Sequence, residues 1–413
     1  MHRARYLAEA LSGRHESCAR SRRRRADPVR VQELDLPSRF TAALDAVPAG
    51  LRAGPIGLAV SGGSDSTALL HLAHRWAKAR GAQLAVFTVD HHLRAGSAAE
   101  AEQVAAAARG LGLAHQTLHW ADPAPRQSAA RRARHALLAS ALRAAGGGLL
   151  LTGHTADDQA ETFLMRARQG SGWYGLAGMR TLALSPVWPE GAGVWIARPL
   201  LDETRADLRR WLTGQGQGWA DDPSNDNAAF ERVRVRARLS RSGEMSQRVL
   251  RCQGGFARLR RLEDAALADW LARAVRVNTD GGLVAAFAGL RPERAARGLG
   301  VLVQCAGGHE TPPRSSSLAD LAGRILDPAG FRGATLGRVC LRPAGGHIVF
   351  SPDPGSPGAP TDPARLMARI DAFRTLFLNS AQELTGLTGK ESFLQGLTPI
   401  FTPEPDFFAR DLP

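Results

Sequence analysis

Hydrophobic and polar positions along the first half of the chain follow two alternating periods. Short apolar runs, typical of buried strands, lie at 56–60, 83–89, 114–119, 148–152 and 194–197. Longer stretches with apolar residues at helical spacing separate them, at 64–80, 98–110, 128–145 and 155–168. Strands that alternate with helices of this length predict an α/β fold, a doubly wound parallel sheet with helices on both faces.

The second half of the chain has a different pattern. After one more predicted helix at 202–214, the turn-rich DDPSNDN segment marks a boundary, and 228–305 is mostly helical and basic. Strands are expected near 338–342 and 347–351, and a helix at 364–379 follows a Pro/Gly-rich stretch. We therefore expect six parts: an N-terminal extension with a short helix near 38–46 (1–50), an α/β domain (51–222), a helical domain (228–310), a small mixed segment (315–351), a linker (352–363) and a tail (364–413).

Charge is the unusual feature of the composition. The 413 residues carry a formal net charge of +14, and Lys78 and Lys390 are the only lysines, so nearly all of the positive charge is Arg. A basic chain of this size predicts a polyanionic partner, nucleic acid before a membrane surface. The four cysteines form no CxxC pair, which argues against a disulfide framework, a paired-cysteine sulfur carrier and a structural zinc site. Without a transmembrane run or a secretory segment, we expect a cytoplasmic protein with no membrane partner.

The six residues SGGSDS at 61–66 separate the first predicted strand from the first long helix. One interpretation is a strand-to-helix turn, in which Gly supplies unusual backbone angles and Ser or Asp caps the helix. The other is an anion-binding loop, in which backbone N–H groups, hydroxyls and the helix N-terminus hold phosphate. A Walker-type site is excluded, since no lysine lies near position 61. Asp65 would either complement the helix dipole or hold Mg²⁺ that bridges to phosphate.

The segment GHTADDQAETFLMR at 153–166 places four polar residues on one face of a predicted helix: His154, Asp157, Asp158 and Glu161. Capping by Thr155, with the acids complementing the helix dipole, explains the two aspartates. We favour function over capping alone, because three adjacent carboxylates repel one another unless a metal or a cationic substrate joins them. This segment and SGGSDS both follow predicted strands, so they share the carboxyl edge of the sheet, where such sheets bind ligands.

Other segments have both a structural and a functional interpretation. His91 and His92, after the second strand, are most often structural, and the basic face of AARRARHALL at 129–138 is normally solvated. QGSGWYGLAGM at 169–179 is too Gly-rich for a core and predicts a loop adaptable enough to fold over a ligand. Residues 231–261 carry ten Arg against two Glu, which we interpret as a footprint for a phosphate backbone.

Taken together, these motifs resemble those of the N-type ATP pyrophosphatases, or PP-loop superfamily, and within it the tRNA(Ile)-lysidine synthetase family. SGGSDS alone marks only the superfamily. The more specific resemblance rests on HTADDQAETFLMR followed by GSGWYGLAGM, together with HHLRAGSAAEAE, ARRARHALL, RPLLDETRADL and DDPSNDNAAFERVRVR, all in the family's order and spacing. It covers 56–240, somewhat under half of the chain.

The resemblance implies an enzyme that uses ATP, with Mg²⁺, to join the ε-amine of free L-lysine to C2 of the wobble cytidine in the CAU-anticodon isoleucine tRNA. AMP and pyrophosphate are the implied products. The implied ATP-binding residues are Ser61, Gly62, Gly63, Ser64, Asp65 and Ser66, and the implied reacting centre is Asp158, Glu161, Arg134 and His154. The residues that we assign to lysine or tRNA binding are Asp157, Arg94, Ser171, Gly172, Asp222, Asn225, Arg232, Arg234 and Arg236.

The sequence departs from the family pattern at four positions. Gln127 and His135 stand where the family often has Glu and Tyr, Gln169 where it often has Arg, and Val233 where it has Asn. The change at Gln127 removes a carboxylate, so the role of its counterpart is not carried over. The alternatives are another adenylating enzyme of the same fold, either a tRNA sulfur-transferase or an amide-forming synthetase, and a non-catalytic RNA-binding protein with a relic nucleotide pocket.

Overall fold

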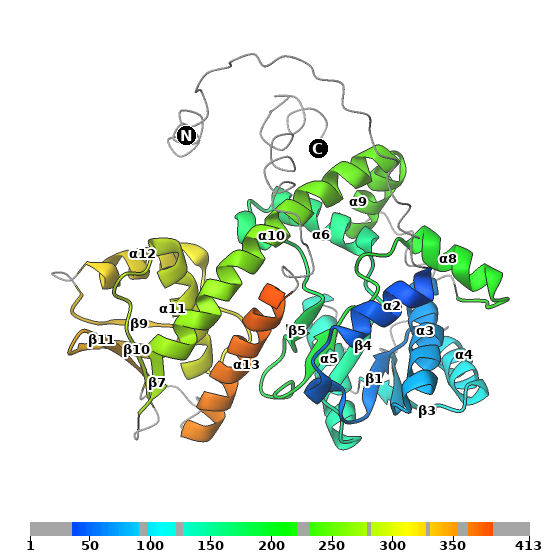
Figure 1. Ribbon diagram of the computed structural model, residues 1–413, viewed down its shortest axis with the longest axis horizontal. Helices are drawn as coiled ribbons and strands as arrows, with labels where there is room; N and C mark the ends of the chain where they lie inside the picture. The colour runs from blue at the N-terminus through cyan, green and yellow to red at the C-terminus, as the bar shows by residue number, and fades with distance from the viewer. Residues whose placement is uncertain are drawn as a thin grey trace, which may run out of the picture. The chain divides into compact units, whose positions relative to one another are not determined.

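A six-stranded sheet with the order β3-β2-β1-β4-β6-β5 forms from the first half of the chain (Figure 1). The computed structural model describes residues 35–90, 97–120, 127–220, 231–278, 282–327, 331–353 and 362–382. The strands are β1 (Ile56–Ala59), β2 (Leu84–Asp90), β3 (Ala114–His119), β4 (Leu149–Thr152), β5 (Leu182–Leu184) and β6 (Trp195–Ala197). All neighbours pair in parallel except β5 and β6, which confirms the predicted α/β fold.

Helices cover both faces of this sheet, and alternate strand residues face them. One apolar core includes α2 (Leu36–Asp45), α3 (Ser64–Arg80), α4 (Ser97–Gly110) and α8 (Arg205–Gly214), and the other includes α5 (Gln127–Ala144). Leu149 and Leu151 of β4 join the first core and Leu150 joins the second, as the pleat of a strand requires. Gly57 lets β1 approach α5 closely, because a Cβ there would lie 3.1 Å from the Leu142 side chain.

A second, five-stranded antiparallel sheet has the order β7-β8-β11-β10-β9. Its strands are β7 (Val275–Val277), β8 (Leu283–Ala285), β9 (Ala334–Leu336), β10 (Val339–Ala344) and β11 (His347–Pro352). The helices of this half are α9 (Glu231–Ser240), α10 (Gly243–Ala274), α11 (Pro292–Ala306), α12 (Ser315–Leu326) and α13 (Pro363–Gln382). The predicted small mixed segment therefore exists, but β7 and β8 lie in a stretch that we predicted to be mostly helical.

Three short or connecting elements complete the described chain: η2 (Ala49–Arg52), α6 (Ala156–Arg168) and α7 (Trp173–Leu176). The long helix α10 contacts α6 and α7 of the first half and α9, α11 and α13 of the second. Phe40 and Leu44 of α2 are buried in the same core as α3, although α2 falls within the expected N-terminal extension. The six-part division of the chain stays a prediction. None of the helices in the described ranges is both long and apolar enough to cross a membrane.

Candidate functional site

The SGGSDS loop connects β1 to α3 at the carboxyl edge of the first sheet. Gly62 has φ 88°, a left-handed conformation that favours glycine, and the chain turns there into the helix. Ser66 Oγ accepts a hydrogen bond from the Ser61 amide (3.2 Å) and donates to the Gly63 carbonyl (3.0 Å), which fixes the turn. No side chain caps α3, and a Cβ at Gly63 would meet no atom within 4 Å. The loop therefore combines an open main chain with a helix N-terminus, an arrangement suited to an anion.

Arginines of α8 reach this loop. Arg209 Nε donates to Ser64 Oγ (3.3 Å), and Ser64 Oγ donates to Asp65 Oδ1 (3.1 Å). Arg205 Nε donates to Asp65 Oδ2 (3.0 Å). Burial raises the pKa of Asp65 above its ordinary value, although Arg205 acts in the opposite direction. Both oxygens of Asp65 are thus engaged by protein groups.

The acids of α6 lie across the same edge of the sheet. Thr155 is the N-cap, and its amide donates to Asp158 Oδ2 (2.9 Å) while the Asp158 amide donates to Thr155 Oγ1 (3.4 Å), a capping box. The capping interpretation is therefore correct for one oxygen of Asp158. Asp157 Oδ2 accepts a hydrogen bond from the Arg205 amide (2.7 Å). Asp158 Oδ1 and both oxygens of Glu161 remain for other partners.

Arginines of α9 supply those partners. Arg232 bridges the two acids, with Nη2 3.0 Å from Asp158 Oδ1 and Nε 2.7 Å from Glu161 Oε2. Arg236 Nε lies 2.8 Å from Glu161 Oε1, and the Glu161 side chain is only 1% exposed. The positive charge that these carboxylates require is therefore provided here by the protein itself.

Arg205 joins the loop and the acids into one site. Besides its bond to Asp65, its guanidinium lies 3.6 Å from Asp158 Oδ1 and 3.7 Å from Glu161 Oε1. Burial alone would lower the pKa of Arg205, but Asp65 and Asp158 raise it above its ordinary value. The side chain is 18% exposed, so this bridge is largely protected from solvent.

Two histidines near the start of α6, His154 and His135, are surrounded by the positive charges of arginines. His154 Nδ1 is 2.9 Å from Thr152 Oγ1, and burial together with the charge of Arg198 lowers its pKa to about 3. His135 of α5 is buried, and burial together with Arg134 lowers its pKa to about 3 as well. Both histidines are therefore neutral near pH 7. Arg134 is exposed, whereas its neighbour His135 is buried, and the assignment of Arg134 to the reacting centre stays a prediction.

Two helices, α6 and α10, hold the Gly-rich segment at 169–179, part of which forms α7. Arg166 of α6 donates to the Gly175 carbonyl (2.6 Å), and Arg260 of α10 donates to the Gly178 carbonyl (2.7 Å). A Cβ at Gly178 would lie 2.5 Å from the Gln159 side chain. The segment that we predicted as an adaptable loop thus forms a hydrogen-bonded joint between α6 and α10. Ser171 and Gly172 lie within it, between α6 and α7.

The comparisons with known proteins agree on one family. A family model described as a PP-loop domain matches residues 36–242. A tRNA(Ile)-lysidine synthase of Hyphomonas neptunium is 54% identical over 362 residues, which cover 88% of this chain and 97% of that protein. The chain belongs to the tRNA(Ile)-lysidine synthase family of PP-loop proteins.

Some other members of the lysidine synthase family extend well beyond the matched region. A tRNA(Ile)-lysidine synthase of Mesorhizobium japonicum is 42% identical over 292 residues, which cover 68% of this chain and 64% of that protein. The chain thus spans less than two thirds of that relative. Among solved structures, the U34-tRNA thiolase NcsA of Methanococcus maripaludis matches 54% of this chain and 77% of its own, with 14% identity and a TM-score of 0.43.

Most of the residues predicted for a lysidine synthase site lie at one edge of the sheet in this family member. Arg232 and Arg236 join Asp158 and Glu161, and Arg234 is exposed on α9. Three of the predicted residues lie outside the described ranges: Arg94, Asp222 and Asn225. His91 and His92 also lie outside them. The residues that sequence reasoning did not assign are Arg205, Arg209, Arg131 and Arg198. Two of them, Arg198 and Arg205, stand in the RPLLDETRADL motif, which was the available signal.

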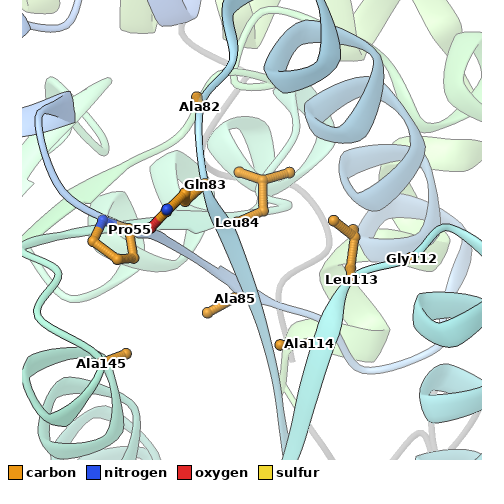
Figure 2. A pocket seen from close by; sticks show the side chains of 9 residues that line it. All are labelled: Pro55, Ala82, Gln83, Leu84, Ala85, Gly112, Leu113, Ala114 and Ala145. Atoms are coloured by element: carbon orange, nitrogen blue, oxygen red, sulfur yellow. The ribbon is translucent and has the colours of Figure 1, made fainter.

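A hollow at the opposite edge of the sheet has a different character (Figure 2). It lies at the amino ends of β1, β2 and β3, and its lining residues are Pro55, Ala82, Gln83, Leu84, Ala85, Gly112, Leu113, Ala114 and Ala145. Gln83 is the one polar side chain among these nine. We therefore place the chemistry of this lysidine synthase family member at the carboxyl edge.

Proposed function

We propose that this chain joins the ε-amine of free L-lysine to C2 of the wobble cytidine in the CAU-anticodon isoleucine tRNA, consuming ATP and releasing AMP and pyrophosphate. The observation that carries the proposal is the bridge made by Arg205, 3.0 Å from Asp65 and 3.6 Å from Asp158. Through it, a loop suited to polyphosphate and acids suited to an amine belong to one site. The relative matched over 97% of its length is named for lysidine in isoleucine tRNA.

ATP would bind with its β- and γ-phosphates on residues 61–66. The first-turn N–H groups of α3 and the open main chain at Gly63 support this assignment, since they offer positive partial charge without a lysine. Arg209, which reaches Ser64, adds a full positive charge beside the loop. The α-phosphate would then lie toward α5 and α6, where the acids and Arg134 are.

Mg²⁺ would accompany ATP, since divalent cations neutralise phosphate charge in phosphoryl transfer. Within the described ranges, no group of three or more His, Cys, Asp or Glu is placed to hold a metal ion. Asp65, which we predicted as a ligand, uses one oxygen for Ser64 and the other for Arg205. The residues present do not fit a protein-held Mg²⁺, and we assign no step of the reaction to it.

The first step is attack of cytidine O2 on the α-phosphate, which forms an O–P bond and releases pyrophosphate. Cytidine O2 is a poor nucleophile, so the charge that develops on the phosphoryl oxygens needs stabilisation. We assign this role to Arg134, which is exposed and has no carboxylate partner within the described chain. The cytidine has to leave its stack to react, and a single-stranded anticodon loop makes that step easier.

The second step is attack of the lysine ε-amine on C2, which forms the C–N bond and releases AMP. The free ammonium has a pKa of ~10.4 and has to lose a proton first. Asp158 and Glu161 would bind the ammonium in place of the Arg232 guanidinium and then accept its proton. Arg232 lies on the same helix as the exposed Arg234, so we propose that tRNA phosphates draw Arg232 away from the acids.

The tRNA would lie along the basic helices α9 and α10. Arg241 is exposed just before α10, and Arg248 and Arg251 are exposed in its first part, next to the helix that covers the acids. Arginine stripes of this kind neutralise backbone phosphates, and the affinity that they supply falls steeply with salt. This interface brings the anticodon loop to the carboxyl edge of the sheet in our proposal.

The test is an assay with purified protein, ATP, L-lysine and the CAU-anticodon isoleucine tRNA. We expect AMP and pyrophosphate in step with lysine incorporation, and release of ADP would contradict the proposal. AMP production driven by sulfide or ammonia rather than lysine would assign the chain to another adenylating activity. Tight tRNA binding without any ATP consumption would leave only RNA binding. The variant Asp158→Asn should lose lysine incorporation and retain ATP binding.

A further inference from the structure

Arg131 and Arg198 are two neighbouring arginines without an acidic partner in the described chain. Arg131 lies on α5, and Arg198 directly follows β6. Since β6 pairs with β4, Arg198 lies at the same carboxyl edge as His154. Burial and the positive charge of Arg131 lower the pKa of Arg198 to about 10. Burial and the positive charge of Arg232 also lower the pKa of Arg131 below its ordinary value.

Two buried nitrogen atoms near these arginines also lack hydrogen-bond partners among the described residues. They are Arg198 Nε and His135 Nδ1. Arg198 Nη1 donates to the Arg180 carbonyl (2.8 Å), so the guanidinium is anchored on one side only. His135 lies one turn beyond Arg131 on α5 and is 7% exposed. Buried polar atoms are nearly always paired, and unpaired ones next to uncompensated cations point to an anionic ligand.

The acid pair that would receive the lysine ammonium adjoins this cationic group. Arg232 contacts Asp158 and Glu161, and its charge also lowers the pKa of Arg131 and of His154. Arg232 is therefore a neighbour both of the negative group, Asp158 and Glu161, and of the positive group that includes Arg131. Free lysine has the matching charges, with an ammonium at the end of its side chain and a carboxylate at the other end.

We propose that Arg131 and Arg198, together with His135, bind the α-carboxylate of free lysine while Asp158 and Glu161 hold its ε-ammonium. The inference rests on the proposed function, because it assigns the amino-acid end of the same site. If the inference is correct, the protein binds free lysine tightly only through its α-carboxylate. The site would then select lysine over diamines of the same length, which lack that group. A phosphate of ATP is the other oxyanion that such cations could bind, and the experiment separates the two.

The experiment compares L-lysine with cadaverine, which has the same amine but no carboxylate, as substrates in the AMP-release assay. For the wild-type protein we expect KM for cadaverine to exceed that for lysine about tenfold or more, as for loss of a charge-assisted hydrogen bond. Arg131→Met and Arg198→Met should each raise KM for lysine by about tenfold and leave KM for cadaverine and for ATP within about twofold. Arg143→Met, an exposed change in the last turn of α5, is the matched control and should behave as wild type.

Two results would overturn the inference. Equal increases of KM for lysine and cadaverine, or an increase of KM for ATP, would assign the two arginines to phosphate. Arg131 is exposed, so its variant tests the idea even if Arg198→Met fails to fold, and Arg198→Lys should partly restore lysine affinity. Direct calorimetric binding of lysine to the ATP-loaded protein separates this inference from the proposed function. If no tRNA product forms, weaker lysine binding in both variants still supports the carboxylate site, and unchanged binding refutes it.

Discussion

The bridge made by Arg205 allows a sharp test of how the site is assembled. Replacement of Arg205 by Met keeps an unbranched, flexible side chain and removes the guanidinium with its charge. Asp65 would then lose its 3.0 Å partner, while Asp158 and Glu161 would keep Arg232 and Glu161 would keep Arg236. Asp65 is therefore the group most affected, and its carboxylate would stand within the proposed phosphate loop without its arginine partner.

The magnitude follows from the contacts and their burial. A hydrogen bond to a charged group contributes about 1.5–3 kcal/mol, and removal of one partner from a buried pair costs about 3–5 kcal/mol. Since the Arg205 and Asp65 side chains are 18% and 20% exposed, we expect a loss of about 2 kcal/mol. For a domain of 150–250 residues this corresponds to a decrease in Tm of about 4–8 °C. The uncompensated charge on Asp65 should also raise KM for ATP by about tenfold.

The assay is thermal unfolding together with ATP-dependent AMP release, and the matched control is Arg210→Met. Arg210 lies on the same helix and pairs with Asp207 at 2.5 Å, but its side chain is 75% exposed. Exposed pairs of this kind contribute about 0–1 kcal/mol, so the control should melt close to wild type with an unchanged KM for ATP. If Arg205→Met and Arg210→Met have the same Tm and the same KM for ATP, Arg205 does not join the loop to the acids.

Three further changes test the joint and the buried groups around the site. Gly178→Ala forces a side chain into a backbone conformation with φ 73° and places its Cβ 2.5 Å from the Gln159 side chain. We therefore expect the free energy of unfolding, measured in urea, to fall by about 2 kcal/mol. The control Gly172→Ala, with no atom within 4 Å of its Cβ, should be close to neutral. Asp264→Asn leaves Arg180 buried without its carboxylate and should cost about 3–5 kcal/mol in the same measurement, against less than about 1 kcal/mol for the exposed Asp269→Asn. The folded pKa of His135 is about 3, below its unfolded value, so its stabilising effect is complete above pH 6.5 and is lost as pH falls toward 3. At pH 5 the loss in the free energy of unfolding is about 2 kcal/mol. His135→Gln should therefore flatten the acid side of the stability profile, although four other basic groups still face the position: Arg131, Arg134, Arg198 and His154. An unchanged slope would show that His135 titrates normally.

The sequence predicts the first sheet well because its strands are local apolar runs with clear ends. Five strands are predicted with bounds that differ from the observed ones by at most one residue, including the three-residue β6 inside the VWIA run. The strands that the prediction lacks are β5, β7, β8 and β9, each three residues long. A three-residue strand has no measurable period, and only pairing with distant strands makes it extended.

The candidate site could be predicted only in part, for a related reason. The loop and the acids are local motifs at strand ends, and the strand order places them at one edge. Their neutralisation depends on residues far away along the chain, because Arg205 meets Asp65 across 140 positions and Arg232 meets Glu161 across 71. No local pattern distinguishes these arginines from the many solvated ones in a chain of net charge +14. The hydrogen bonds that hold the Gly-rich segment could not be predicted for the same reason, since their donors Gln253 and Arg260 lie on α10.

The Gly-rich segment at 169–179 and the helix α9 both connect α6, which carries the acids, to the basic part of the chain. The helix that carries Asp158 and Glu161 is held at its acids by α9, through Arg232, and at its far end by α10, through the Gly-rich segment. Gln253 and Arg260 of α10 donate to carbonyls of that segment, and Gln159 of α6 bonds both backbone groups of Met179. The PP-loop match ends at 242, so it includes α9 but not α10. In our proposal, the basic helices that would contact RNA are also the helices that hold α6, so a tRNA that shifts α9 or α10 would act on Asp158 and Glu161.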